Sequence, residues 1–333
     1  MNQWNQIIGH DWAVELLQRA MQHQRIGHAY LITGPAQVGK TTLARTLSQA
    51  LNCLADNEAA RPCGVCRACQ LIAADRHPDV RLVQPEVTGR GNPIIKIEQI
   101  RSLQQELSLA AYEARWKVAI LRQFDAANTS AANAFLKTLE EPPRQVLLLL
   151  TAVDAENLLP TIVSRCRHLP LRPLPRRAIS DALQTRWQIA PDQAELLSHL
   201  ADGRLGWAVQ AVTDKQLQQS RMADLEQLET VLAGSWLERF QQADKLANKA
   251  EELPALLQTW VTWWRDLALT AWQQPDHVVN VDRLPHLQQL AAAWGKPTIL
   301  AGLKQTQTAL WQLQRNANAR LVLENLFLQL PTP

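Results

Sequence analysis

A loop of eight residues constrains the fold of this chain more than any other stretch of its sequence. It matches the pattern G-x-x-x-x-G-K-[ST] at every fixed position, with the residues Gly34, Pro35, Ala36, Gln37, Val38, Gly39, Lys40 and Thr41. The backbone N–H groups of such a turn, and the positive end of the helix that it opens, bind phosphate oxygens. The pattern therefore predicts a nucleotide-binding loop, with an ordinary glycine turn as the alternative.

The residues around the loop agree with this prediction. Residues 28–33 are typical of a buried strand and residues 41–51 of a helix, which is the order that a phosphate loop requires. Lys40 supplies a positive charge for the phosphates, and the hydroxyl of Thr41 is a ligand for the accompanying magnesium ion. We expect nucleotide contacts from Gly34 through Thr42.

Four of the five cysteines lie within seventeen positions, at Cys53, Cys63, Cys66 and Cys69. Two overlapping C-x-x-C steps and a further thiol predict a tetrahedral zinc site. Four thiolates leave no open position on the metal for catalysis, so the predicted zinc is structural. Disulfides are one alternative, and unligated cysteines or a redox pair are another.

Apolar runs that alternate with helical patterns predict an α/β sheet. Strands are expected at residues 28–33, 79–83, 116–121 and 146–151, and helices at 7–24, 97–109 and from 129 onward. Strands that are apolar along their whole length are buried on both faces, so the sheet should be parallel.

The helix expected from residue 129 ends at Glu140, Glu141, Pro142 and Pro143. Two adjacent carboxylates suggest acid and base catalysis, but consecutive residues on a helix do not face each other. A solvated helix end is the favoured interpretation.

The second half of the chain begins with three prolines and three arginines in residues 170–177. This composition predicts a stiff linker at a domain boundary. The arginines are interpreted as solvated, with phosphate contacts as the alternative.

From residue 214 onward the pattern is almost wholly helical and includes seven of the twelve tryptophans. Apolar residues recur every three or four positions, which favours a core: Leu253, Leu256, Leu257, Trp260, Trp264 and Leu267, with Trp263 and Trp272 nearby. A surface that stacks single-stranded bases is the alternative, but it needs interleaved basic residues that are scarce here.

Composition limits the class of protein. The longest apolar stretch, residues 146–153, is too short to span a membrane, so no membrane partner is expected. The net charge of +3 includes no long basic run and gives no argument of its own for nucleic acid. Residues 1–4 show no secretory pattern, and we expect a cytoplasmic protein.

Four stretches together resemble one family, the delta-prime subunits of the bacterial DNA polymerase III clamp loader, which are relatives of the AAA+ ATPases. They are residues 34–42, the cysteine cluster 53–69, the stretch 131–143 (AANAFLKTLEEPP), and Ser164, Arg165 and Cys166. The resemblance is detailed to about residue 170. Beyond that it is weaker and depends on residues 203–208 and 316–330.

The resemblance implies an AAA+ P-loop domain at residues 1–170 with the zinc module at 53–69, a helical lid at 171–213 and a helical collar at 214–333. It implies a hetero-pentamer with gamma/tau-type motor subunits and a delta-type clamp-opening subunit. The implied task is to help ATP-dependent loading of the sliding clamp onto primed DNA, with clamp and DNA contacted through the complex.

The chain departs from a hydrolysing relative at three positions. Where such a relative ends a strand with a magnesium-holding Asp and a water-orienting Glu, this chain has Arg122 and Gln123. Arginine does not coordinate metals, and its charge beside the loop would disfavour magnesium and attract phosphate oxygens. Asp125 is interpreted as a cap or turn residue rather than a substitute ligand. Gly206 stands where motor subunits have a lid arginine, with Arg204 two residues away.

Arg165 lies in an intact Ser-Arg-Cys motif. In the family this arginine acts in trans on the nucleotide of a neighbouring subunit, so the resemblance implies an arginine finger. A salt bridge or a structural role is the alternative. Cys166 is interpreted as a small buried hydrophobe.

The sequence thus predicts a clamp-loader subunit that binds ATP or ADP, binds Mg²⁺ poorly and hydrolyses ATP weakly or not at all. Two alternatives stay open at this point. One is an active motor ATPase of the same fold, and the other is a zinc-containing nucleic-acid-binding protein.

Overall fold

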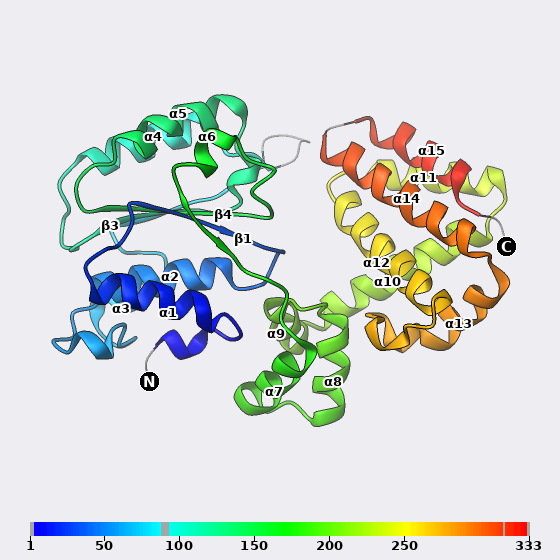
Figure 1. Cartoon of the computed structure of the whole chain (residues 1–333). Coiled ribbons are helices and arrows are strands. Elements are labelled where there is room, and N and C mark those ends of the chain that lie inside the picture. Colours follow the sequence, from blue (N-terminus) through cyan, green and yellow to red (C-terminus); the bar gives the residue numbers. More distant parts are fainter. Residues whose placement is uncertain (1–2, 88–92, 316, 332–333) are drawn as a thin grey trace. The chain divides into compact units, whose positions relative to one another are not determined.

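The computed structural model describes residues 3–87, 93–315 and 317–331 (Figure 1). The chain divides into two compact units. Among the described residues, the first contains 3–87, 93–178 and Gly203–Gly206, and the second contains residues 179–202 and those from 207 onward.

The first unit is built on a five-stranded parallel sheet in the order β2-β3-β4-β1-β5. Its strands are β1 (Ala29–Thr33), β2 (Val80–Val83), β3 (Lys117–Leu121), β4 (Val146–Ala152) and β5 (Arg167–Pro170). Every residue of β1 and β4 is buried, as expected for central strands covered on both faces. Strand β1 lies between β4 and the edge strand β5, and the loop that follows β1 emerges at the carboxyl end of these parallel strands.

Helices cover both faces of this sheet. In Figure 1, α1 (Asp11–Gln22), α2 (Lys40–Asn52) and α3 (Arg67–Ala73) lie on one face, and α4 (Ile97–Ser108), α5 (Thr129–Glu140) and α6 (Pro160–Val163) lie on the other. The side chains of β1 alternate accordingly. Tyr30 and Ile32 join a core with α2, while Ala29 and Leu31 join a core with α5. The predicted α/β fold class is confirmed.

Short 3-10 turns complete the first unit, at η1 (Gln3–Gln6), η2 (Glu58–Ala60) and η3 (Phe124–Ala126). The helix expected at residues 7–24 is shorter, because Gly9 has a φ of +72° and α1 begins only at Asp11.

The predicted linker at residues 170–177 needs correction at both ends. Pro170 is the last residue of β5, a strand that the sequence did not predict, and Arg176 already opens a helix. Strand β5 is short, lies at the sheet edge and exposes three of its four residues, so it lacks the apolar run of a central strand.

The second unit is helical. It contains α7 (Arg176–Trp187) and α9 (Leu205–Thr213), whose first residues still belong to the first unit. The other helices are α8 (Pro191–Leu200), α10 (Lys215–Ala233), α11 (Trp236–Ala247), α12 (Leu253–Ala271), α13 (Leu284–Ala293), α14 (Lys296–Gln314) and α15 (Ala319–Gln329). The turns η4 (Pro275–His277) and η5 (Val281–Arg283) precede α13. None of the helices among the described residues combines the length and apolar character needed to cross a bilayer.

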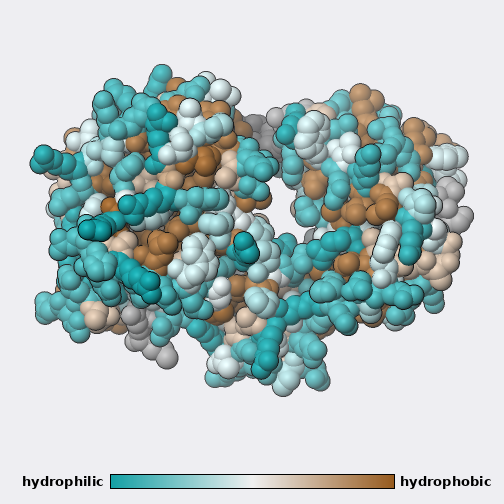
Figure 2. Space-filling view, in the orientation of Figure 1, coloured by the Kyte–Doolittle hydropathy of each residue, from teal (hydrophilic) through white to brown (hydrophobic). Residues whose placement is uncertain are grey.

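The tryptophans of α12 form the core of this unit. Trp260, Trp263 and Trp264 are fully buried, which confirms the core interpretation for them, while Trp272 is 41% exposed. Gly302 of α14 makes room for Trp264, because a Cβ at position 302 would lie 2.6 Å from its ring. On the face drawn in Figure 2, hydrophobic residues are interspersed among hydrophilic ones.

A buried arginine ties α11 to the end of the described chain. Arg239 is 1% exposed and donates at 2.8–3.2 Å to the carbonyl oxygens of Leu232, Gly234, Phe327, Leu330 and Pro331. Since each carbonyl oxygen receives a charged donor, this guanidinium is well compensated for its burial.

Candidate functional site

The predicted phosphate loop lies between the carboxyl end of β1 and the first turn of α2. Gly34 has a φ of +140°, and a Cβ there would lie 2.2 Å from the carbonyl oxygen of Leu171. Gly39 caps α2 with a φ of +110°, in open space. Glycine is therefore required at position 34 by backbone and space, and at position 39 by backbone alone. The N-terminus of α2 is open to a phosphate group.

Lys40 folds back onto this loop. Its Nζ donates to the carbonyl oxygens of Gly34 and Pro35, at 2.5 and 2.7 Å. Burial lowers the pKa of Lys40 to about 8, and the charge of Asp125 acts in the opposite direction. An ammonium group has three N–H donors, so the lysine can give its remaining donor to a phosphate oxygen without leaving the loop.

Two further residues support the loop from outside. His10 is buried and its Nε2 donates to the carbonyl oxygen of Val38 at 3.1 Å; burial lowers the pKa of this histidine. The N–H of Gly206 donates to the carbonyl oxygen of Gln37 at 2.9 Å, and a Cβ at Gly206 would lie 2.7 Å from that oxygen. Gly206, aligned from the sequence with a lid arginine of motor subunits, thus packs its backbone on the loop. Sequence reasoning missed His10, which no motif marks.

The end of β3 carries the departures from a hydrolysing site. Nη1 of Arg122 donates to Oε1 of Gln84, the residue that follows β2, at 3.3 Å. Strand β2 lies on the opposite side of β3 from β4 and β1, so this contact draws the guanidinium away from the loop. The backbone of Gln123 has a φ of +49°, and its N–H donates to Oγ1 of Thr151 at 3.0 Å.

Asp125 is the acidic residue whose charge reaches Lys40. Its Oδ2 accepts from the N–H of Val153 at 3.0 Å, where the chain leaves β4. This bond agrees with the turn role favoured from the sequence and occupies one of the two carboxylate oxygens.

Arg165 lies at the amino end of the parallel strands, whereas the phosphate loop lies at their carboxyl end. It precedes β5, whereas the loop follows β1, and these adjacent strands are parallel. Four or five residues of strand correspond to roughly 15 Å. Nη2 of Arg165 lies 2.7 Å from Oε1 of Glu140, so the salt bridge considered from the sequence is present. Burial raises the pKa of the neighbouring Cys166 thiol to about 12, which agrees with an unreactive cysteine.

The four clustered cysteines join α2 to α3. Their Sγ atoms all lie within 4.8 Å of one another, and all four are free thiols. Sulfur atoms around a tetrahedral zinc ion with bonds of about 2.3 Å are about 3.8 Å apart, so this set fits a zinc ion after small adjustments. The N–H groups of Cys63 and Cys66 donate to Sγ of Cys53 and Cys63, each at 3.3 Å.

Such hydrogen bonds favour the thiolate form. Burial opposes ionisation of Cys63, yet the N–H groups of Cys66 and Val65 lower the pKa of its thiol to about 6. Burial raises the pKa of Cys69. A bound metal would displace the remaining protons, so metal binding and folding of this segment are coupled.

The zinc hypothesis predicts one equivalent of metal in the purified chain. Metal analysis should find close to one zinc per chain, and Cys69→Ser should lose it and lower the temperature of unfolding, because a ligand is removed. Cys166→Ser is the matched control, since Cys166 lies outside the cluster, and its zinc content should not change. Less than about half an equivalent, with thiols free to react, would rule out the four-thiolate site.

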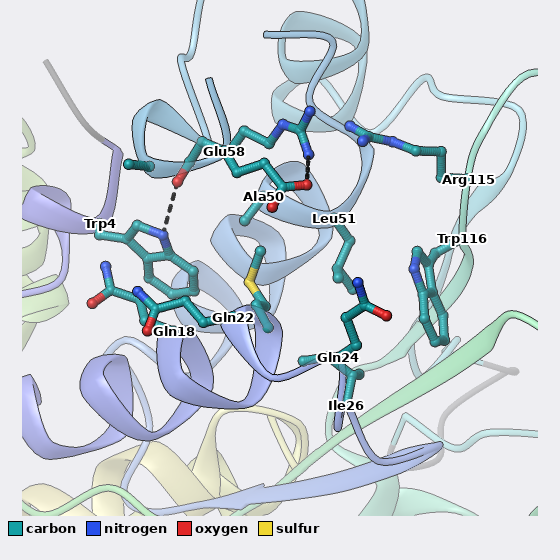
Figure 3. A pocket seen from close by; sticks show the side chains of 13 residues that line it. Trp4, Gln18, Gln22, Gln24, Ile26, Ala50, Leu51, Glu58, Arg115 and Trp116 are labelled. Atoms are coloured by element: carbon teal, nitrogen blue, oxygen red, sulfur yellow. Dashed lines mark hydrogen bonds and ion pairs between the residues drawn. The ribbon is translucent and has the colours of Figure 1, made fainter. Parts of the chain in front are cut away.

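A separate pocket of about 820 Å³ opens at the far end of α2 (Figure 3). Trp4 and Trp116 stand on opposite sides of it, and three glutamine side chains line it, Gln18, Gln22 and Gln24. The remaining lining residues are Met21, Ile26, Ala50, Leu51, Glu58, Ala59, Arg61 and Arg115. Helix α2 is about 20 Å long, and no residue of the phosphate loop lines the pocket. The pocket is therefore distinct from the candidate nucleotide site.

The chain is similar to subunits of bacterial DNA polymerase III. The family model described as DNA polymerase III, delta subunit, matches residues 9–175. DNA polymerase III subunit delta' of Bacillus subtilis (strain 168) is 28% identical over 327 residues, which cover 95% of this chain and 94% of that protein. The subunit delta' of Pseudomonas aeruginosa is 39% identical over 190 residues, 57% of this chain and 56% of that protein.

Similarity extends to a second kind of subunit. DNA polymerase III subunit gamma/tau of Mycobacterium tuberculosis (strain H37Rv) is 34% identical over 174 residues. The match covers 52% of this chain but only 29% of that longer protein.

Proposed function

The chain belongs to the family described as DNA polymerase III, delta subunit, and on this premise we propose that it acts as the delta-prime subunit of a clamp loader. In this role it helps ATP-dependent loading of the sliding clamp onto primed DNA. Its partners are gamma/tau-type motor subunits and a delta-type clamp-opening subunit in a hetero-pentamer, and the complex contacts clamp and DNA. The role implies the cytoplasm, where bacterial DNA is replicated.

The observation that carries the proposal is the position of Arg165 relative to the chain's own phosphate loop. The two lie at opposite ends of the parallel strands β1 and β5 and are separated by the length of these strands. An arginine so placed does not reach a nucleotide at Gly34–Thr42, and it is 35% exposed for contact with another chain. We therefore infer that Arg165 serves the nucleotide of a neighbouring subunit in trans.

The chemistry around the loop supports a subunit that binds nucleotide without hydrolysing it. The glycines and Lys40 of a phosphate loop are in place, so ATP or ADP fits there. Magnesium has no carboxylate at Arg122 or Gln123 to hold it, and Gly206 provides no lid arginine. Zinc in the cysteine cluster is structural in this proposal.

The helical regions supply the contacts between subunits. We propose residues 171–213 as the lid and 214–333 as the collar that joins the ring. Large apolar side chains lie exposed on the collar helices, with Trp236 50%, Leu237 69% and Leu321 62% exposed. Exposed apolar surface of this kind is suited to a subunit interface.

The alternatives have less support. A motor ATPase would need Asp125 as its metal ligand, whereas the hydrogen bond from Val153 gives this carboxylate a role in the turn after β4. For a protein that stacks bases, Trp260, Trp263 and Trp264 of α12 are not accessible, because they are buried.

Assembly tests the proposal directly. We expect this chain, mixed with the gamma/tau-type and delta-type subunits of its own organism, to co-elute with them as one complex of defined mass. The motor and delta-type subunits without this chain are the control. If the partners assemble with each other but this chain elutes alone at micromolar concentration, the proposed function is wrong.

A further inference from the structure

We propose that Glu140 is a positioning residue for Arg165. The carboxylate of Glu140 orients the guanidinium of Arg165 toward the phosphate of a nucleotide bound by a neighbouring subunit. The inference rests on the proposed function and deepens it, because it names a second residue of the trans contact. It begins from the ion pair of 2.7 Å between Arg165 Nη2 and Glu140 Oε1.

The guanidinium of Arg165 is held at both terminal nitrogens. While Nη2 contacts Glu140, Nη1 donates to the carbonyl oxygen of Thr161 at 2.9 Å and to Oγ of Ser164 at 3.5 Å. A guanidinium is planar, so fixing its two terminal nitrogens fixes the plane of the group. It has five N–H donors, and those not used by these acceptors remain for a phosphate.

The helix itself does not favour a carboxylate at position 140. Glu140 is the last residue of α5, where the partial negative charge of the helix C-terminus repels an anion. The contact with Arg165 places a positive charge against this end. Thr161 and Ser164 lie on and just after α6, so α5 and α6 together hold the arginine in front of β5.

The same ion pair could in principle retain Arg165 and keep it from a partner's phosphate. The side chains of Arg165 and Glu140 are 35% and 50% exposed, so water screens the pair and separating it costs little. A triphosphate carries more negative charge than one carboxylate and competes well for the free N–H groups. Orientation is therefore the larger effect, because a long side chain that is already ordered loses less entropy on binding.

The test uses the assembled clamp loader with clamp and primed DNA. Glu140→Ala should lower kcat for ATP at the neighbouring site roughly two- to tenfold with KM unchanged, the range expected for ordering one long side chain. Glu140→Gln keeps an acceptor oxygen and should lose less. Glu141→Ala is the matched control, because no ion pair of Glu141 is found in residues 3–87, 93–315 and 317–331.

Combining variants separates positioning from a structural effect. In an Arg165→Ala background, Glu140→Ala should have no further effect, because no guanidinium is left to orient. An equal further loss there would mean that Glu140 acts on structure, and a rise in kcat with Arg165 present would mean that it retains the arginine. Either result overturns the inference.

The failure of this inference and that of the proposed function are distinguishable. If Arg165→Ala slows the loader but Glu140→Ala does not, positioning by Glu140 is wrong while the trans role stands. If Arg165→Ala itself leaves turnover unchanged in an intact complex, the trans role falls and the inference falls with it. Equal unfolding temperatures of the isolated variants should accompany each measurement, since both side chains lie at the surface.

Discussion

Replacing Arg165 with alanine in the assembled clamp loader should slow ATP hydrolysis at the neighbouring site by about a thousandfold or more. Arginine fingers supplied in trans are worth roughly 10³–10⁵ in kcat, because they neutralise charge that develops in the transition state. Arg165 is partly exposed and lies at the end of the strands opposite its own phosphate loop. This position is suited to that role.

The readout has to isolate one site. Other motor sites keep their own fingers, so the steady-state rate falls only by the share of the affected site, and single-turnover measurement of phosphate release resolves that phase. Arg144→Ala is the matched control, because Arg144 is an exposed arginine. It precedes β4 as Arg165 precedes β5, and the two strands run parallel, so both arginines lie at the amino end of the sheet. An unchanged turnover with intact assembly would reject the trans role.

The isolated chain should hydrolyse ATP no faster than its own Lys40→Ala variant, although we propose that the loop binds nucleotide. A hydrolysing site needs a carboxylate to hold magnesium and a second group to orient water. At those positions the chain has Arg122, which contacts Gln84, and Gln123, whose backbone is anchored on Thr151. We therefore expect a rate orders of magnitude below that of motor subunits.

Measurement of phosphate release with excess magnesium tests this expectation, and nucleotide binding by the same samples supplies the control. Wild-type chain should bind ATP or ADP while Lys40→Ala binds more weakly, since a charge donor to the phosphates is lost. Robust magnesium-dependent hydrolysis that Lys40→Ala abolishes would show that the chain is a motor and that Asp125 or another group replaces the missing ligand.

Features encoded by neighbouring residues could be predicted from the sequence. The strand, loop and helix around Gly34–Thr41 depend on consecutive residues, and the closeness of the four cysteines on seventeen positions, so local spacing sufficed to predict both arrangements. The central strands were found because burial on both faces requires continuous apolar runs. The expected strand at residues 146–151 corresponds to β4, Val146–Ala152.

Contacts between distant residues could not be predicted in this way. Glu140 was interpreted as part of a solvated helix end, and only the fold shows that it faces Arg165. The direction of Arg122 depends on which strand lies beside β3, and sequence order does not reveal that β2 is its outer neighbour. Strand β5 was missed because an exposed edge strand ending in proline has no periodic signal.

The close packing of Gly206 on Gln37 limits how this protein can be re-engineered. Installing aspartate and glutamate at positions 122 and 123 would restore only part of a hydrolysing site. The lid arginine of motor subunits would also have to be introduced at Gly206, where a Cβ would lie 2.7 Å from a carbonyl oxygen of the phosphate loop. Any side chain added there would displace the backbone of the phosphate loop at Gln37. Conversion to a motor would therefore require a new main-chain path through Gly203–Gly206, which exchange of side chains alone does not provide.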